Sequence, residues 1–150
     1  MNLAIKQAKI AASIDEVPVG CVVTNQSGDI VSYGYNQTIS KCDPTAHAEI
    51  IAIRSAAISA KNYRLCDFTI YVTVEPCIMC MGAIVHARFS RLVYGAPDPK
   101  WGASGSLYDF SCDDRLNHKI EVVSGVCINQ TREIIRNFFR DKRSNKKCQI

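Results

Sequence analysis

The sequence predicts an α/β fold: a three-layer α/β/α sandwich around one mixed five-stranded sheet. Two β-rich runs near the N-terminus are separated by turn-forming residues, which is typical of a hairpin. After the hairpin, helical and strand-like segments alternate to the end of the chain. With 150 residues and 47% hydrophobic content, the chain is long enough for one core and too short for two, so residues 1–150 are expected to form a single domain.

The N-terminal third is expected to hold one helix and the hairpin. Regularly spaced apolar residues predict a helix over residues 2–14, which Pro18 and the glycine after it would end. Residues 19–24 and 30–35 are rich in β-formers and predict two strands. The residues between them favour a turn, so the two strands are expected to pair as a hairpin.

The remaining two thirds of the chain alternate between helix and strand. Pro76 is expected to open a helix, because the first turn does not need the missing N–H of proline. The segment from Asp43 to Thr45 is typical of a helix start. Helices are therefore expected over residues 46–60, 76–87 and 131–142, and strands over residues 68–74, 91–94 and 120–123.

The positive charge of the chain is concentrated near its C-terminus. The chain carries a net +4, but residues 132–147 hold seven basic and two acidic residues, a net +5, which leaves the rest near −1. A basic helix is typical of a surface that binds nucleic acid. A solubilising tail is the alternative interpretation.

Cysteine usage and hydrophobic patterning predict a soluble cytoplasmic protein. Eight cysteines would fit a disulfide framework only in a secreted chain, and the lysines at positions 6 and 9 interrupt any signal-peptide core. No apolar run approaches the roughly 20 residues of a membrane-spanning helix. The thiols are therefore expected to be reduced and available to a metal.

Two short motifs predict a catalytic zinc site. Cys77 and Cys80 are three residues apart, so their thiols share one face of a helix, and a helix N-terminus stabilises thiolates. His47 is expected at the start of another helix. Taken alone, the cysteine pair also fits a redox pair or a structural zinc site, and the histidine also fits a helix cap. Three ligands leave the fourth zinc position to water, as in a catalytic site, although Cys42 remains an open candidate for that position.

Glu49 is the expected proton carrier. A zinc ion lowers the pKa of its water toward neutrality, and the resulting nucleophile is able to attack an amidine carbon. Ammonia then needs a proton to depart, and Glu49 is placed to move it from the water to the ring nitrogen and the leaving amine. The alternative role of Glu49 is an ordinary first-turn acid that complements the helix dipole.

The zinc motifs match the signature of zinc-dependent nucleobase deaminases, and the chain as a whole resembles the bacterial tRNA-specific adenosine deaminases. The matching segments cover nearly its whole length: Glu16-Val-Pro-Val-Gly20, Gly34-Tyr-Asn36, Asp43-Pro-Thr-Ala-His-Ala-Glu49, Asn62-Tyr-Arg-Leu65, Val74-Glu-Pro-Cys-Ile-Met-Cys80, Gly102-Ala-Ser-Gly-Ser106, Asn117-His118 and Phe138-Phe-Arg140. The resemblance implies the cytidine-deaminase-like fold, a homodimer with one Zn²⁺ per subunit, and conversion of adenosine to inosine at the wobble position of a tRNA anticodon stem-loop.

The resemblance also implies where the substrate binds. Asn36 and the backbone of Ala48 would contact the flipped base, and Asp98 a ribose hydroxyl; Asn36 and Asp98 are otherwise simple turn residues. Tyr94 lines the pocket or belongs to the core. The anticodon loop would lie on the C-terminal helix at Phe138, Phe139 and Arg140, with one phenylalanine facing the core and the other stacking on a base.

One loop departs from the family pattern. Pro97 and Trp101 stand where a basic or small polar residue is expected, so the departure concerns RNA contacts and leaves the metal site unchanged.

Two other functions remain open. A zinc deaminase of a free base or nucleoside, such as guanine or cytosine, is disfavoured by the basic helix and by Asp98. A non-catalytic zinc-containing RNA-binding subunit is disfavoured by Glu49, which a structural site does not need.

Overall fold

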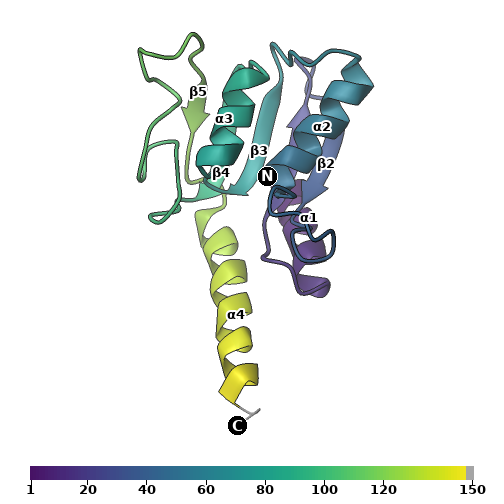
Figure 1. Ribbon diagram of the computed structural model, residues 1–150, viewed down its shortest axis with the longest axis vertical. Coiled ribbons are helices and arrows are strands. Elements are labelled where there is room, and N and C mark those ends of the chain that lie inside the picture. The colour runs from purple at the N-terminus through teal and green to yellow at the C-terminus, as the bar shows by residue number, and fades with distance from the viewer. Residues whose placement is uncertain (148–150) are drawn as a thin grey trace.

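The computed structural model describes residues 1–147 of the chain, with side chains through residue 144. It contains one five-stranded sheet and four helices (Figure 1). The elements, in chain order, are α1 (Asn2–Ser13), β1 (Gly20–Thr24), β2 (Ile30–Tyr35), α2 (Ala48–Ala60), β3 (Thr69–Val74), α3 (Ile78–His86), β4 (Arg91–Ala96), β5 (Glu121–Val123) and α4 (Ile128–Lys147).

The sheet is mixed, with the strand order β2-β1-β3-β4-β5. β1 pairs antiparallel with β2 and β3, whereas β3, β4 and β5 run parallel. Helices α2 and α3 cover one face of the sheet, and α1 lies behind the other (Figure 1). The predicted fold class is confirmed. Parallel neighbours need a long crossover connection: α3 connects β3 to β4, and the long loop over residues 97–120 connects β4 to β5.

Helix α2 packs very closely against β2, and a glycine makes that approach possible. A Cβ on Gly34 would lie 2.1 Å from the carbonyl oxygen of Ala48, the first residue of α2. Ser32 of the same strand also donates a hydrogen bond to the Ala52 carbonyl at 2.7 Å. These contacts hold the N-terminus of α2 against the sheet, where the metal-binding motif begins.

All four helices differ from their predicted bounds, although α1 differs by only one residue, since it ends at Ser13. α2 begins at Ala48 and α3 at Ile78, so His47 and Cys77 are the N-cap residues of their helices, both with extended backbones. α4 is 20 residues long and begins at Ile128, not Thr131, and ends at Lys147 instead of about Lys142. Its N-terminal part packs on β4, and the remainder projects beyond the sheet (Figure 1).

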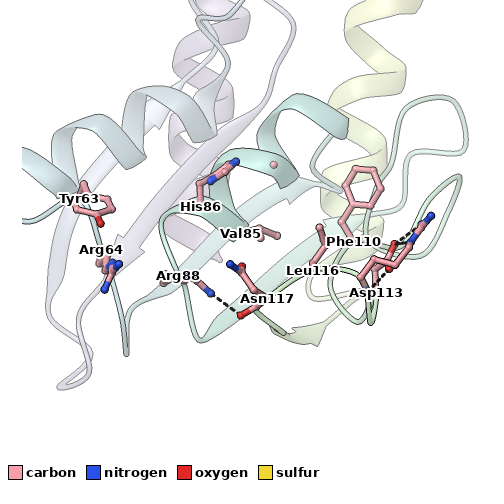
Figure 2. Close-up of a pocket in the computed structure, with 11 residues that line it drawn as sticks. Tyr63, Arg64, Val85, His86, Arg88, Phe110, Asp113, Leu116 and Asn117 are labelled. Atoms are coloured by element: carbon pink, nitrogen blue, oxygen red, sulfur yellow. Dashed lines mark hydrogen bonds and ion pairs between the residues drawn. The ribbon is translucent and has the colours of Figure 1, made fainter.

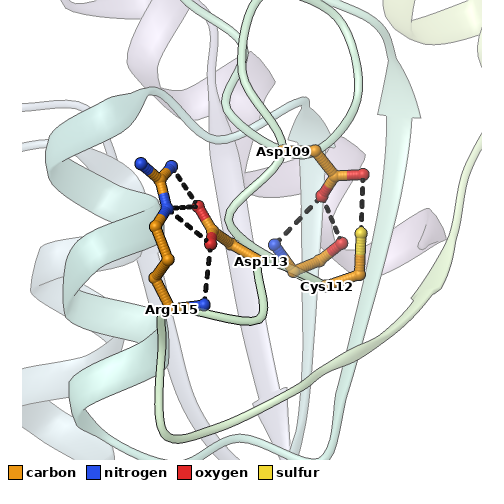
Figure 3. Close-up of polar contacts among 5 residues, drawn as sticks. Asp109, Cys112, Asp113 and Arg115 are labelled. Carbon is orange, nitrogen blue, oxygen red and sulfur yellow. Dashed lines mark hydrogen bonds and ion pairs between the residues drawn. The ribbon is translucent and has the colours of Figure 1, made fainter.

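The long loop between β4 and β5 is ordered by short-range polar contacts (Figure 3). Asp109 accepts hydrogen bonds from the backbone N–H of Ser111 at 3.0 Å and from the thiol of Cys112 at 3.3 Å. Asp113 accepts from the backbone and the guanidinium of Arg115, at 2.9 Å and 2.6 Å. Each aspartate bonds the backbone two residues ahead, as is typical of turns built on Asp.

No helix in the described part of the chain is both long and apolar enough to cross a membrane. The seven cysteines that the structure describes all carry free thiols. Cys21 is fully buried in the core, as expected of a small apolar residue, but Cys127 is only half-buried, because it lies outside the strands, directly before α4.

Candidate metal centre and active site

The N-termini of α2 and α3 bring three metal-ligating side chains together. The Nδ1 of His47 lies 3.7 Å from the Sγ of Cys77 and 3.5 Å from the Sγ of Cys80. All three ligand atoms lie within 4.8 Å of one another. Tetrahedral zinc with Zn–N and Zn–S bonds of about 2.0 and 2.3 Å places its nitrogen and sulfur ligands about 3.6 Å apart. The donor set therefore fits Zn²⁺ in both chemistry and spacing.

The environment of Cys77 favours the thiolate that binds a metal. A hydrogen bond from Cys80 lowers the pKa of Cys77 to about 4, with further help from His47, although burial opposes the shift. The same bond, together with burial, raises the pKa of Cys80. A hydrogen bond to Cys77 in turn raises the pKa of His47.

Glu49 lies in the first turn of α2, directly after Ala48, and is almost fully buried, with 3% of its surface exposed. Its Oε2 has no hydrogen-bond partner among the described residues. Burial raises the pKa of Glu49 to about 7, because desolvation disfavours the charged carboxylate. A buried oxygen without a hydrogen-bond partner costs folding free energy. This atom is therefore expected to bind a ligand or a proton during the reaction.

The structure gives Asn36 a clear positioning contact. Asn36 is buried, and its Oδ1 accepts a hydrogen bond from the backbone N–H of Ala48 at 2.9 Å. This contact satisfies one of the free N–H groups at the start of α2. The amide nitrogen of Asn36 remains available as a donor, whereas the Ala48 N–H is already used. Contact of Asn36 and Ala48 with a base stays a prediction.

Asp98 lies in the loop that follows β4, close to a buried carboxylate. Its own Oδ1 accepts from the N–H groups of Lys100 at 2.9 Å and Trp101 at 3.3 Å, so it shapes a turn, as one of the two interpretations expected. Its backbone N–H donates to Oε2 of Glu75 at 3.0 Å. Its contact with a ribose hydroxyl stays a prediction.

The other predicted substrate residues belong to β4 and α4. Tyr94 is buried within the hydrophobic core, with its hydroxyl 3.5 Å from the Ser104 carbonyl. Phe138 is half-buried and Phe139 is 42% exposed, and neither belongs to the core. Phe138 is thus the more buried of the two, and it lines a groove with Ala12 and Asp15. Arg140 is exposed on the same helix.

Cys42 is not a fourth ligand. Within residues 1–147, the His47–Cys77–Cys80 group is the only one of its kind whose ligand atoms converge. The Cys42 side chain is exposed, and its thiol donates to the Ile39 carbonyl at 3.7 Å. The remaining cysteine, Cys148, lies outside the described residues.

Sequence reasoning assigned no role to two buried carboxylates beside the site. Glu16 is fully buried, and its Oε1 accepts from the backbone N–H groups of Ile39 and Ser40, each at 2.8 Å. Glu75 is 3% exposed and its Oε1 accepts from the N–H groups of Ser104 and Ser106, each at 3.0 Å. Each is a single acidic residue next to an apolar strand or helix. This pattern indicates a buried carboxylate with a hydrogen-bond partner.

A cavity of about 660 Å³ lies on the outer side of α3, separate from the metal cluster. Val85 and His86 of α3 line one side, and Phe110 and Leu116 of the long loop line the other (Figure 2). Arg88 closes one end with a hydrogen bond to the Asn117 carbonyl at 2.7 Å. The metal ligands do not line this cavity.

The fold and the site together define a zinc-dependent deaminase. The family model described as the cytidine and deoxycytidylate deaminase zinc-binding region matches residues 1–96, and the chain belongs to this family. Within it, the chain is similar to a tRNA-specific adenosine deaminase from Haemophilus influenzae, with 46% identity over 149 residues, which cover 99% of this chain and 86% of that relative.

Solved structures give the same result for the fold. A structure described as belonging to tRNA:A34 deaminases, which perform A-to-I editing at the wobble position of transfer RNA, matches with a TM-score of 0.86 and 42% identity. The match covers 89% of this chain and 96% of that one. A guanine deaminase from Nitrosomonas europaea matches with a TM-score of 0.78 at 19% identity, over 91% and 81% of the two chains, and so shares the fold.

Proposed function

We propose that this protein hydrolyses the wobble adenosine of a tRNA anticodon to inosine and releases ammonia. The observation that carries the chemistry is the buried Glu49 Oε2, which lacks a partner within the described residues and lies beside a three-ligand donor set. A structural zinc site normally has four protein ligands. It therefore needs neither a position for water nor a nearby carboxylate that transfers protons. The adenosine substrate is supported by the relatives, which are named tRNA-specific adenosine deaminases.

Each residue of the site has its own role in the reaction. When bound by His47, Cys77 and Cys80, zinc supplies the Lewis acidity that makes water a nucleophile near neutral pH. As the water oxygen bonds to C6 of the base, Glu49 accepts a proton from it and delivers one to N1. Glu49 then takes the remaining proton from the new C6 hydroxyl and passes it to the amine. The C6–N bond breaks as C6=O forms, so the products are inosine and ammonia. Asn36 is placed to hold the base edge through its amide nitrogen.

The basic helix supports an RNA substrate over a free base. Four arginines of α4 are exposed to solvent: Arg132, Arg136, Arg140 and Arg143. Exposed guanidinium groups along one helix suit a phosphate backbone. Phe139 is also exposed beside them, and an exposed aromatic is suited to stack on an unpaired base. We assign Phe138, Phe139 and Arg140 to the anticodon loop on this basis.

Incubation of the zinc-loaded protein with an anticodon stem-loop that carries adenosine at the wobble position tests the function. Free adenosine, guanine and cytidine serve as parallel substrates. Inosine formed in the stem-loop alone is the expected result. Deamination of a free base alone would instead favour the guanine-deaminase type of activity, with which this chain shares its fold.

We also propose that the protein is a homodimer and acts in the cytoplasm. The cavity beside α3 presents Phe110 and the 36% exposed Leu116 to solvent, and such a patch suits a second protein surface. Light scattering should give twice the chain mass, and Leu116→Arg should shift the protein toward the monomer. A monomeric wild-type protein would contradict the dimer. An unchanged dimer in the variant would place the interface on another surface.

A further inference from the structure

Trp101, in the loop that follows β4, has an unusually exposed side chain. It is the only tryptophan of the chain and is 62% exposed, although a tryptophan side chain is usually well buried. It lies in the loop where the sequence departs from the pattern of the family. An exposed indole has a hydrophobic cost unless another molecule covers it.

The loop joins Trp101 to a backbone segment that pairs with the metal site. Gly102, the next residue, forms an isolated antiparallel bridge with the metal ligand Cys77. Ala103 continues the contact, because its N–H donates to the Pro76 carbonyl at 2.9 Å. The indole is therefore attached one residue away from the backbone that pairs with a zinc ligand.

Hydrogen bonds hold the backbone on both sides of Trp101. Before it, the Asp98 N–H donates to Glu75 at 3.0 Å, and after it the N–H groups of Ser104 and Ser106 donate to the same carboxylate, each at 3.0 Å. Gly102 makes room for this carboxylate, since a Cβ there would lie 2.4 Å from the Glu75 Cδ.

The turn itself is also rigid. Asp98 accepts from the Trp101 N–H at 3.3 Å, and the prolines on either side of Asp98 have restricted backbone angles. Lys100, directly before the indole, is exposed and carries positive charge. A rigid aromatic group loses little conformational entropy when a ligand binds, which favours its use as a contact surface.

We propose that Trp101 is a stacking platform for the unpaired base next to the target adenosine, and thereby a specificity-determining residue for RNA over free nucleosides. This inference rests on the proposed function, because it requires a target nucleotide with neighbours. A base that leaves its stack to enter the site exposes the π-face of the adjacent base, and an indole beside the site replaces the lost stacking. Lys100 pairs with the phosphate between the two nucleotides.

The chain carries its own probe, because all tryptophan emission comes from Trp101. The zinc-loaded protein is titrated with a stem-loop whose target base lacks the 6-amino group, so that no turnover occurs. Binding is followed independently by the anisotropy of a labelled stem-loop. Quenched, blue-shifted emission that saturates with the anisotropy is expected. Removal of one flanking base, with its sugar and phosphate kept, should abolish the quenching.

Kinetics with variants provide the second measurement. Trp101→Ala should raise KM for the stem-loop by about 5- to 150-fold, which corresponds to the 1–3 kcal/mol of one stacked base, while kcat changes less than twofold. Trp101→Phe should restore most of the affinity. Tyr33→Ala removes an exposed aromatic from the edge strand β2 and should leave both constants unchanged.

Three outcomes would overturn the proposal. The first is saturated binding without any change in emission, and the second is wild-type KM in Trp101→Ala. The third is emission that follows protein dilution instead of RNA, because a second copy of the chain would then cover the indole. If the wild-type protein makes no inosine in any stem-loop, the proposed function itself fails. Inosine formation that is indifferent to Trp101 contradicts this inference alone.

Discussion

At the scale of single residues, the site is defined by a carboxylate in an unfavourable position. Glu49 is buried and one of its oxygens has no partner within the described structure. Such an arrangement costs folding free energy, so it is expected where function requires it. His47 and Glu49 reach the same site because one caps the helix and the other lies in its first turn.

Replacement of Glu49 by glutamine tests its role as the proton carrier. Glu49→Gln keeps the size of the side chain but removes its ability to accept and return a proton. Inosine formation should therefore fall by about 10²- to 10⁴-fold. Zinc content, measured by mass spectrometry, should remain at one ion per chain. Activity within tenfold of the wild type would contradict the mechanism.

Loss of a metal ligand should affect both zinc content and stability. Cys77→Ser replaces the ligand whose thiolate is most stabilised, and zinc bound only to the folded state contributes to its stability. We expect substoichiometric zinc, a lower Tm and no deamination, and a strong chelator should lower the Tm of the wild type in the same way. Cys66→Ser, at an exposed cysteine, is the matched control. Equal zinc content in both variants would rule out Cys77 as a ligand.

At the scale of elements, buried acids connect segments that the chain separates. Glu16 follows α1 and binds residues 38–40, which precede the metal-binding His47. Burial raises the pKa of Glu16, but hydrogen bonds from Ser40, Thr38 and Ile39 together outweigh burial and lower the pKa below its usual value. The ionised form is thus the one that holds the loop in place.

The lowered pKa of Glu16 predicts how stability depends on pH. A carboxyl whose pKa is lower in the folded state stabilises the fold above its unfolded pKa, and this stabilisation is lost as the pH falls through the folded pKa. Glu16→Gln should lower the Tm at pH 7 by about 3–8 °C. The difference from the wild type should shrink on acidification below about pH 4, near the usual glutamate pKa.

Thermal unfolding from pH 3 to pH 8 measures this difference. Glu133→Gln, at an exposed glutamate of α4, is the control and should leave the Tm unchanged at every pH. A Tm difference for Glu16→Gln that is independent of pH would show that the charge of Glu16 does not stabilise the loop.

At the scale of the whole molecule, the exposed arginines of α4 and the metal ligands lie in different parts of the fold. The metal ligands lie at helix starts on one face of the sheet, whereas α4 projects beyond the sheet with its arginines exposed (Figure 1). The proposed RNA substrate would contact both regions, whereas a free base would contact only the metal site.

Charge reversal on α4 should weaken RNA binding without affecting chemistry. The double variant Arg136→Glu and Arg140→Glu should raise KM for the stem-loop at least tenfold and leave kcat near its wild-type value. The slope of log affinity against log salt should become shallower by about 0.7 for each lost phosphate contact to single-stranded RNA. Lys6→Glu with Lys9→Glu, on exposed positions of α1, carries the same change of charge as a control. Equal KM values in the two double variants would exclude α4 as an RNA-binding surface.

The order of helices and strands was predictable because each segment carries its own periodicity. The apolar spacing of α1, the turn-forming residues of the hairpin and the proline before α3 are all local signals. The ends of elements were less predictable. His47 and Cys77 proved to be caps, and α4 extends farther at both ends, because helix boundaries depend on neighbouring segments.

The sequence by itself determined the fold class and the metal ligands, since histidine and cysteine spacing is a property of the chain. Only the tertiary structure decided which polar groups are buried and what they contact. Asn36 accepts a hydrogen bond from the start of α2, Glu75 holds the loop of Trp101, and Cys42 bonds the Ile39 carbonyl outside the metal-ligand cluster. These outcomes depend on distances between residues far apart in the sequence, and periodicity and composition do not contain such distances.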